Sequence, residues 1–207
     1  MTAKPTTFFI AAVTALLLFA QTIQPVLANE AATDLIKRTA TKMLSTLEMQ
    51  RADVDRDPRL IYQLVSEILL PHFDFAAITQ SAVGSSWRTA TPQQRTALID
   101  GFQQMLVRTY ARALLNYTGQ DIIYQSAKPG TRPNTVIVPT LVRAPGAAAV
   151  PIDYRLKQQG SEWKVYDVVI ENVSLIANYR GQFRSIISSG GIDGLIQELT
   201  TKNASKL

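Results

Sequence analysis

Few side chains in this sequence are suited to covalent chemistry. The 207 residues include one histidine, His72, and no cysteine, which excludes thiol nucleophiles, disulfides and cysteine-based zinc sites. Ser85 and Ser86 follow a glycine, but no Gly-x-Ser-x-Gly elbow surrounds them. A hydrolase also needs a base and an orienting acid beside its nucleophile. We therefore interpret His72 as a surface or capping residue.

Two further patterns resemble ligand sites but lack essential parts. Asp53, Asp55 and Asp57 have the spacing that opens a calcium loop, yet the glycine and the distal glutamate of an EF-hand are missing. The glycines near the C-terminus form neither a P-loop nor a dinucleotide fingerprint. We expect the aspartates to lie at a solvated helix N-terminus, and we expect no metal and no cofactor.

One acid–base arrangement stays open on the segment 163–171. If this segment is a strand, alternate side chains share a face. One face then carries Trp163, Val165, Asp167, Val169 and Glu171. An enzyme that uses Asp167 with Tyr166 or Tyr110 is therefore one hypothesis. Since both faces are largely apolar, the strand is either covered on both sides or lines a cavity.

The N-terminus has the order of a secretory signal. Lys4 precedes an apolar run from Phe8 to Ala20, and a polar stretch then leads to the small residue Ala28. The run is shorter than the roughly 20 residues that span a bilayer. We predict that residues 1–28 are removed near Ala28 and that residues 29–207 form one domain in the periplasm. Removing Lys4 lowers the formal net charge from +5 to +4, and we expect no nucleic-acid partner.

Helical spacing of apolar residues predicts most of the remaining elements. Helices are expected over residues 31–50, 58–70, 75–82, 92–118 and 175–199, the last with a break at Gly190-Gly191. The helix that starts at Thr91 has the clearest signal. Pro92 suits a first helical turn, and Gln94 completes a capping box with Thr91.

The periodicity changes to that of strands between residues 120 and 171. Four strands are expected, over residues 121–126, 135–143, 150–158 and 162–171. Short turns between them favour an antiparallel meander. Helices, then one sheet, then helices indicate an α+β fold.

The segment 165–176 reads Val-Tyr-Asp-Val-Val-Ile-Glu-Asn-Val-Ser-Leu-Ile. It resembles the MlaC family, also called the toluene-tolerance auxiliary family of periplasmic phospholipid-binding proteins. The resemblance continues through Tyr179-Arg180, Phe183 and Gly190–Leu195, and upstream through Leu69-Leu70-Pro71 and Thr91–Arg95. It covers nearly all of residues 29–207.

The resemblance implies a nuclear-transport-factor-like curved four-stranded sheet with a long helix over residues 91–173, and a mostly helical subdomain over residues 29–90 and 174–207. It also implies an apolar pocket for acyl chains between the sheet and this subdomain. It implies a non-enzymatic carrier that exchanges phospholipid with an outer-membrane lipoprotein–porin complex and with an inner-membrane ABC transporter through its MCE-domain protein. Such a system maintains the lipid asymmetry of the outer membrane. The alternatives are the enzyme described above and a periplasmic adaptor that holds a protein helix in an apolar groove.

The composition agrees with a carrier on physical grounds. Two acyl chains expose about 30 methylenes, and at about 0.8 kcal/mol each their transfer to water costs about 24 kcal/mol. Apolar walls remove this cost, and 46% of the residues are hydrophobic. The predicted wall residues are Phe102, Leu106, Tyr110, Val136, Val138, Tyr154, Val168, Ile170, Leu175, Ile176, Tyr179, Phe183 and Ile187. Each also fits plain core packing, and the pattern leaves open which sheet face lines the pocket.

Polar groups for a head group are expected at the pocket mouth. Arg95 lies on the same helical line as Phe102, Leu106 and Tyr110, and a guanidinium there suits a phosphate. Tyr110 adds a hydroxyl at the end of an apolar ring. Glu171 is a candidate to orient Arg95 or the mouth. The alternatives are a solvated Arg95, and a Glu171 that forms an ion pair or a helix cap.

Overall fold

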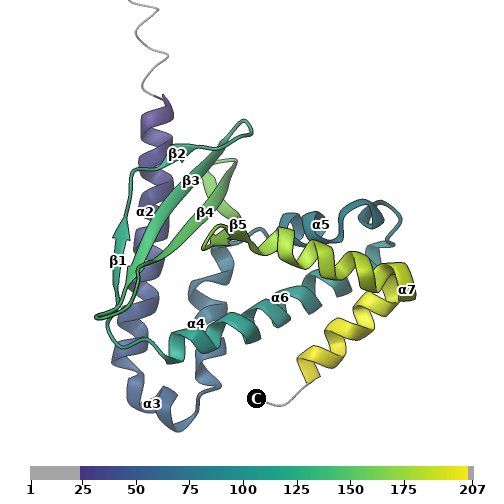
Figure 1. Ribbon diagram of the computed structural model, residues 1–207, viewed down its shortest axis with the longest axis horizontal. Coiled ribbons are helices and arrows are strands. Elements are labelled where there is room, and N and C mark those ends of the chain that lie inside the picture. The colour runs from purple at the N-terminus through teal and green to yellow at the C-terminus, as the bar shows by residue number, and fades with distance from the viewer. Residues whose placement is uncertain (1–23, 205–207) are drawn as a thin grey trace, which may run out of the picture.

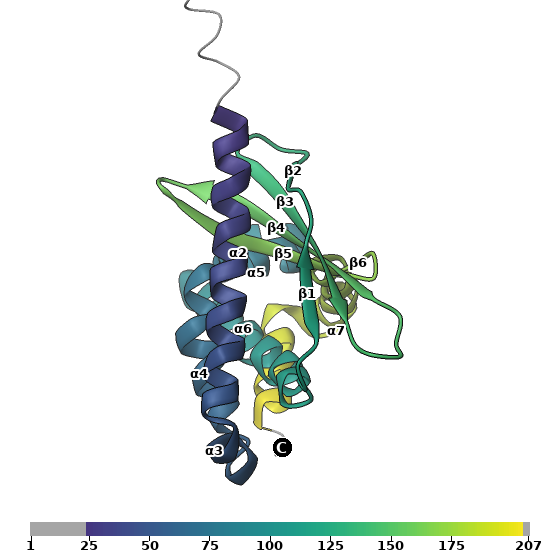
Figure 2. The same cartoon turned by 90° about the vertical axis from the view of Figure 1, so that its left-hand side faces the viewer.

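An N-terminal helix, α2 (Gln24–Met49), runs along an open antiparallel sheet (Figures 1 and 2). The computed structural model describes residues 24–204. The predicted leader falls outside these residues as far as residue 23, and its last five residues belong to α2. Within residues 24–204, no helix combines the length and the apolar character needed to cross a membrane.

The remaining helices largely follow the predicted ranges. They are α3 (Arg51–Arg56), α4 (Leu60–Ile68), η1 (Leu70–His72), α5 (Phe75–Val83), η2 (Gly84–Arg88), α6 (Pro92–Leu115) and α7 (Leu175–Ala204). The kink in α7 falls at Gly191, whose φ of 67° suits glycine. The predicted break at Gly190-Gly191 is therefore confirmed, and the helix beyond it continues past Leu199.

The aspartate run was expected at one solvated helix N-terminus, and part of it lies elsewhere. Asp53 and Asp55 belong to α3 and pair with Arg56 at 2.8 Å and with Arg51 at 2.9 Å. Asp57 follows α3 and accepts hydrogen bonds from the backbone and the side chain of Arg59. In residues 24–204 no cluster of three or more acidic or imidazole side chains is arranged to hold a metal ion.

The capping box predicted at the start of α6 is present. Thr91 Oγ1 accepts from the backbone N–H of Gln94 at 3.2 Å, and Gln94 Oε1 accepts from the N–H of Thr91 at 3.0 Å. The other end of the Gln94 amide donates to Asp193 at 2.7 Å. Further along, Gly101 allows α7 to approach, since a Cβ there would lie 3.2 Å from the side chain of Leu199. The start of α6 is therefore tied to the second half of α7.

The sheet confirms the predicted α+β class. Its strands are β1 (Asp121–Tyr124), β2 (Lys128–Pro129), β3 (Thr135–Arg143), β4 (Val150–Gln159), β5 (Glu162–Ile170) and β6 (Val173–Ser174). They are ordered β1-β3-β4-β5-β6, with β2 also paired to β3, and every pairing is antiparallel. The four predicted strands are therefore present, and two short strands extend the sheet at its margins.

A β-bulge in β5 makes the predicted alternation of its side chains wrong. Arg155 pairs with Asp167 and Leu156 pairs with Val165, so that Tyr166 has no partner on β4. A bulge residue shifts the phase of the strand by one. Val165 and Val168 therefore lie on the same face, whereas Asp167 lies on the other. The ring of Tyr166 stacks instead against the guanidinium of Arg132, 4.8 Å away.

One face of the sheet, its inner face, points toward the helices. Helix α2 covers one part, where Ala32 and Ile36 pack against Val136, Val138, Leu156, Trp163 and Val165. Helices α4 and α6 lie over the other part, at β4 and β5 (Figure 1). Away from the sheet, α5, α6 and α7 form a separate core around Phe102. Core packing therefore covers only part of the inner face of the sheet.

Candidate functional site

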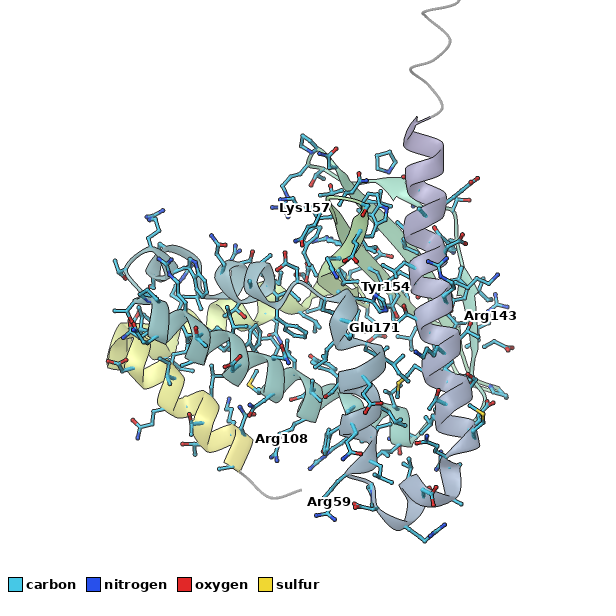
Figure 3. All side chains as sticks on the ribbon, turned by 180° about the vertical axis from the view of Figure 1, so that it is seen from behind. Arg59, Arg108, Arg143, Tyr154, Lys157 and Glu171 are labelled. Carbon is cyan, nitrogen blue, oxygen red and sulfur yellow. The ribbon has the colours of Figure 1, made fainter. Side chains whose placement is uncertain are left out.

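An apolar cavity of about 310 Å³ lies between the sheet, α4, α5, α6 and the first turn of α7. The lining residues are Val65, Leu69, Leu70, Phe73, Phe75, Ile78, Phe102, Leu106, Val107, Tyr110, Ala111, Ala113, Leu114, Ile152, Tyr154, Asp167, Val168, Ile170, Leu175 and Ile176. Tyr154 projects from the sheet toward the helices (Figure 3). Almost every group that faces this space is a hydrocarbon.

Local structure explains why the sheet presents apolar side chains here. Tyr154 pairs with Val168, and Ile152 pairs with Ile170. Because paired residues share a face, all four line the cavity together. The bulge at Tyr166 makes this possible, since without it Val165 and Val168 would lie on opposite faces. The sheet face that lines the cavity is therefore the face covered by α2.

Eight of the thirteen predicted wall residues line the cavity. They are Phe102, Leu106, Tyr110, Tyr154, Val168, Ile170, Leu175 and Ile176. Those on α6 recur every four residues, a spacing that keeps side chains on one helix face. Leu175 and Ile176 begin α7 and close one end of the space.

Five predicted wall residues lie elsewhere. Val136 and Val138 are buried under α2. Tyr179 and Phe183 pack edge-on against Phe102, with ring centres 5.0 and 4.8 Å away. Ile187 packs against the same aromatic core. These side chains are buried in cores outside the cavity. The apolar residues of β3 pack against α2, and those of α7 pack against α5 and α6.

The segment around η1 supplies wall residues that periodicity did not predict. Leu69, Leu70, Phe73 and Phe75 all line the cavity. They surround Pro71, where the chain leaves α4 and turns toward α5. The signal in the sequence was the density of large apolar residues in a segment too short and irregular for a periodic stripe.

Arg95 is not among the residues that line the cavity. Its guanidinium lies 5.4 Å from the ring centre of Trp87 and donates to the carbonyl oxygen of Arg88 at 3.5 Å. At about 1.5 Å rise per residue, Arg95 lies about 22 Å from Tyr110 along the helix. The helical line compared angles around α6 and ignored this axial distance. The expectation that Arg95 lies at the mouth is therefore not met.

Glu171 occupies the tight turn between β5 and β6 (Figure 3). Glu171 and Asn172 both have positive φ, 49° and 66°, between the paired residues Ile170 and Val173. This geometry is typical of a two-residue hairpin turn. Glu171 is exposed, and in the part of the chain that the structure describes it has neither an ion pair nor a link to Arg95. It does, however, follow directly on Ile170, which lines the cavity.

Asp167 is held in a network that ties β5 to α7. Its carboxylate is 4% exposed and accepts from Arg155 at 3.1 Å. Ser174 Oγ donates to it at 2.7 Å, and the backbone N–H of Ile176 donates at 3.3 Å. With these three donors the carboxylate positions the start of α7. The acid–base pair of Asp167 with Tyr166 has no support in this geometry, because Tyr166 is stacked on Arg132.

The tyrosine hydroxyls at the cavity are neutral over the physiological range. The pKa of Tyr154 is raised to about 12, mainly by burial and to a smaller extent by its neighbour Tyr124, while a hydrogen bond with Thr140 opposes the rise. Burial also raises the pKa of Tyr110 to about 12, together with a hydrogen bond to Tyr179. Neutral hydroxyls leave the cavity suited to an uncharged, apolar ligand.

A smaller apolar cavity of about 160 Å³ lies beside the first, between α2 and the sheet. His72, the lone histidine, is on its wall. Burial lowers the pKa of His72, and the nearby Lys164 lowers it further. No side chain on the wall of this second space is therefore charged at neutral pH.

Comparisons with known proteins agree with these observations. The MlaC protein family matches residues 37–201. An intermembrane phospholipid transport system binding protein of Haemophilus influenzae is 27% identical over 168 residues, which cover 80% of this chain and 78% of the relative. A toluene tolerance protein of Pseudomonas putida is 29% identical over 163 residues, or 77% of this chain and 74% of the relative. A phospholipid-binding protein of Ralstonia solanacearum, solved in complex with a phospholipid, superposes with a TM-score of 0.77 at 34% identity, over 84% of this chain and 97% of the other.

Proposed function

The chain belongs to the MlaC family, and from this premise we propose that it is a phospholipid carrier. Its acyl-chain site includes the larger cavity, and the eight predicted wall residues found there contact bound acyl chain. The observation that carries the proposal is this largely hydrocarbon-lined cavity beneath the sheet, in which the carboxylate of Asp167 is held by its own donors. The phospholipid complex of the Ralstonia relative supports it, since that chain is matched over 97% of its length.

Energetics favour a carrier over free diffusion of the lipid. Each methylene that leaves water for the cavity contributes about 0.8 kcal/mol. A lipid with two chains therefore moves from a membrane into water only rarely. Transfer from the membrane into an apolar cavity avoids this cost, because the methylenes are not exposed to water. The protein needs apolar walls for this task, and it needs no reactive group.

The location and partners follow from the same premise. The leader-like residues 1–28 send the chain to the periplasm, where residues 29–207 act as one lipid-binding domain. There it exchanges phospholipid with an outer-membrane lipoprotein–porin complex and with an inner-membrane ABC transporter through its MCE-domain protein. As the soluble component of this Mla-type system, it helps maintain outer-membrane lipid asymmetry.

The polar head group remains near the cavity edge in this proposal. Tyr110 presents a hydroxyl there that hydrogen-bonds Tyr179. Glu171 lies in the turn next to Ile170 and is accessible to solvent. Arg95 is omitted from the proposed contacts because of its distance along α6.

Purification without detergent tests the proposal. The full chain is exported to the periplasm of a Gram-negative host, isolated, and examined by native mass spectrometry and organic extraction. We expect phospholipid to co-purify. A protein that is lipid-free and cannot take lipid from vesicles would contradict the proposal.

Two matched substitutions locate the site. Leu106→Trp fills the larger cavity, whereas Thr109→Trp places the same ring on an exposed position of α6. We expect the first to lose most co-purifying lipid and the second to retain it.

A long incubation with lipid separates a carrier from an enzyme. Lipid recovered unchanged agrees with a carrier, whereas a product that is no longer formed by the Asp167→Asn variant would support an enzyme instead.

A further inference from the structure

The two cavities are neighbours separated by a thin wall. Four residues line both of them: Leu69, Phe73, Leu114 and Tyr154. The larger space lies on the α6 side of this wall. The smaller lies on the α2 side, where α2 crosses the sheet (Figure 2). A single layer of side chains therefore divides one apolar region into two.

The larger cavity is small for a phospholipid with two acyl chains. Pockets that enclose drug-sized ligands have volumes of about 300–1,000 Å³, and 310 Å³ is at the lower end of this range. A phospholipid with two chains and about 30 methylenes is larger than such ligands and needs more apolar contact. The larger cavity therefore suits one chain better than two.

The aromatic half of the wall is held in place. The backbone of Phe73 forms a bridge with Val165, and the next N–H, of Asp74, donates to the carbonyl oxygen of Val165 at 2.9 Å. The Phe73 ring stacks on Phe75 at 5.7 Å. Tyr154 shares a hydrogen bond with Thr140. Movement of these rings would break specific contacts.

The aliphatic half of the wall has no such anchors. Leu69 caps the C-terminal end of α4, and Leu114 lies in the last turn of α6. Both side chains are half-buried and pack against an apolar cluster. Because leucine side chains change rotamer without breaking a hydrogen bond, these two can move aside at small cost.

The smaller cavity has the chemistry that an acyl chain requires. Helix α2 contributes Ile36, Ala40, Met43 and Leu44 to its wall. Methionine adapts to irregular apolar shapes. The polar side chains there, Thr39 and His72, carry no charge at neutral pH. A hydrocarbon chain would meet no unpaired ion in this space.

We propose that a bound phospholipid places one acyl chain in each cavity, with Leu69 and Leu114 as the movable part of the wall. This inference rests on the proposed carrier function and adds a specificity to it. Lipids with two chains use both cavities. Lipids with one chain use only the larger cavity and do not need α2.

Filling the smaller cavity alone tests this division. Ala40→Phe adds a ring to the wall that α2 contributes, and Ala40 does not line the larger cavity. The matched control is Ala31→Phe, the same change at an exposed position of α2. Full-length protein stripped of lipid is titrated with a diacyl phospholipid and with the lysophospholipid of the same head group. Leu44→Trp, at a half-buried residue of the same wall, is a second filling variant in case Ala40→Phe does not fold.

We expect the filled variant to bind the diacyl lipid at least tenfold more weakly and the lysolipid within twofold of the unchanged protein. The control should bind both lipids normally. The division into two chain sites would be overturned if a folded, filled variant bound both lipids as tightly as the unchanged protein does. It would also be overturned if the variant lost affinity for both lipids by the same factor. If the unchanged protein binds neither lipid, the carrier function itself is overturned.

Discussion

Ser174 Oγ donates a 2.7 Å hydrogen bond to Oδ2 of Asp167, and this contact joins the end of the sheet to the start of α7. Ser174 also accepts from the backbone N–H of Ala177 at 3.1 Å, as an N-cap residue does. The residues that follow, Leu175 and Ile176, close one end of the larger cavity. This polar network at β5 therefore positions the apolar walls that α7 contributes to the cavity.

The first prediction concerns this network. Asp167→Ala should lower the free energy of unfolding by about 2–3 kcal/mol, because it leaves Arg155 and two further donors without their acceptor. Ser174→Ala should cost about 1 kcal/mol through the lost cap. Urea denaturation of each variant and of the double variant measures these values. An Asp167→Ala protein as stable as the unchanged chain would show that the network does not stabilise the fold.

The second prediction concerns the start of α6. Thr91→Ala removes the cap of this helix and should cost about 1 kcal/mol. Thr96→Ala, at an exposed position one turn later, should change stability by less than about 0.5 kcal/mol. Thermal unfolding followed by circular dichroism compares the two. Equal effects at the two positions would mean that the capping box contributes nothing.

The third prediction concerns Tyr154 at alkaline pH. Its pKa is about 12 in the folded protein and about 10 in an unfolded chain. The folded state therefore holds this proton more tightly, so its contribution to stability is complete below pH 10 and is lost as the pH rises toward 12. Melting temperatures measured from pH 8 to pH 11 should fall more steeply for the unchanged protein than for Tyr154→Phe. Parallel curves would refute the buried, neutral hydroxyl.

The fourth prediction concerns His72 at acidic pH. Burial lowers its pKa, as do Lys164, Lys42 and Arg38, while Glu162 opposes them. The unfolded chain then binds the proton more readily, so stability is lost as the pH falls below about 6.5. The melting temperature of the unchanged protein should drop more between pH 7 and pH 5 than that of His72→Gln. A larger drop in the variant would reverse the assigned direction of the shift.

Much of the secondary structure was predictable because its signals are local. The capping box at Thr91 and Gln94 depends on residues three apart, and the break at Gly191 depends on one glycine in an otherwise apolar stripe. The strand β3 was predicted with the bounds it has, because turn residues flank its apolar run. In contrast, α3 was missed, since six residues with mixed charges carry no periodic signal.

The candidate site was predicted only in part, for reasons that involve contacts between distant segments. The pattern along α6 placed Leu106 and Tyr110 on the cavity side, but it gave Arg95 the same side without its axial distance. Val138 and Val168 are equally apolar in the sequence. Val138 is fully buried under α2, whereas Val168 packs against the edge of the same core and also lines the cavity. The arrangement of α2, α4 and α6 around the sheet decides this difference.

The sequence by itself determined the α+β class, the absence of thiol chemistry and the surplus of apolar side chains, because composition and short-range spacing decide these properties. The tertiary structure decided which apolar side chains are left without partners. That outcome depends on the bulge at Tyr166, which turns Val168 and Ile170 toward the helices, and on how far α2 extends over the sheet. Packing between segments far apart in the chain leaves the cavity open, and no local pattern encodes it.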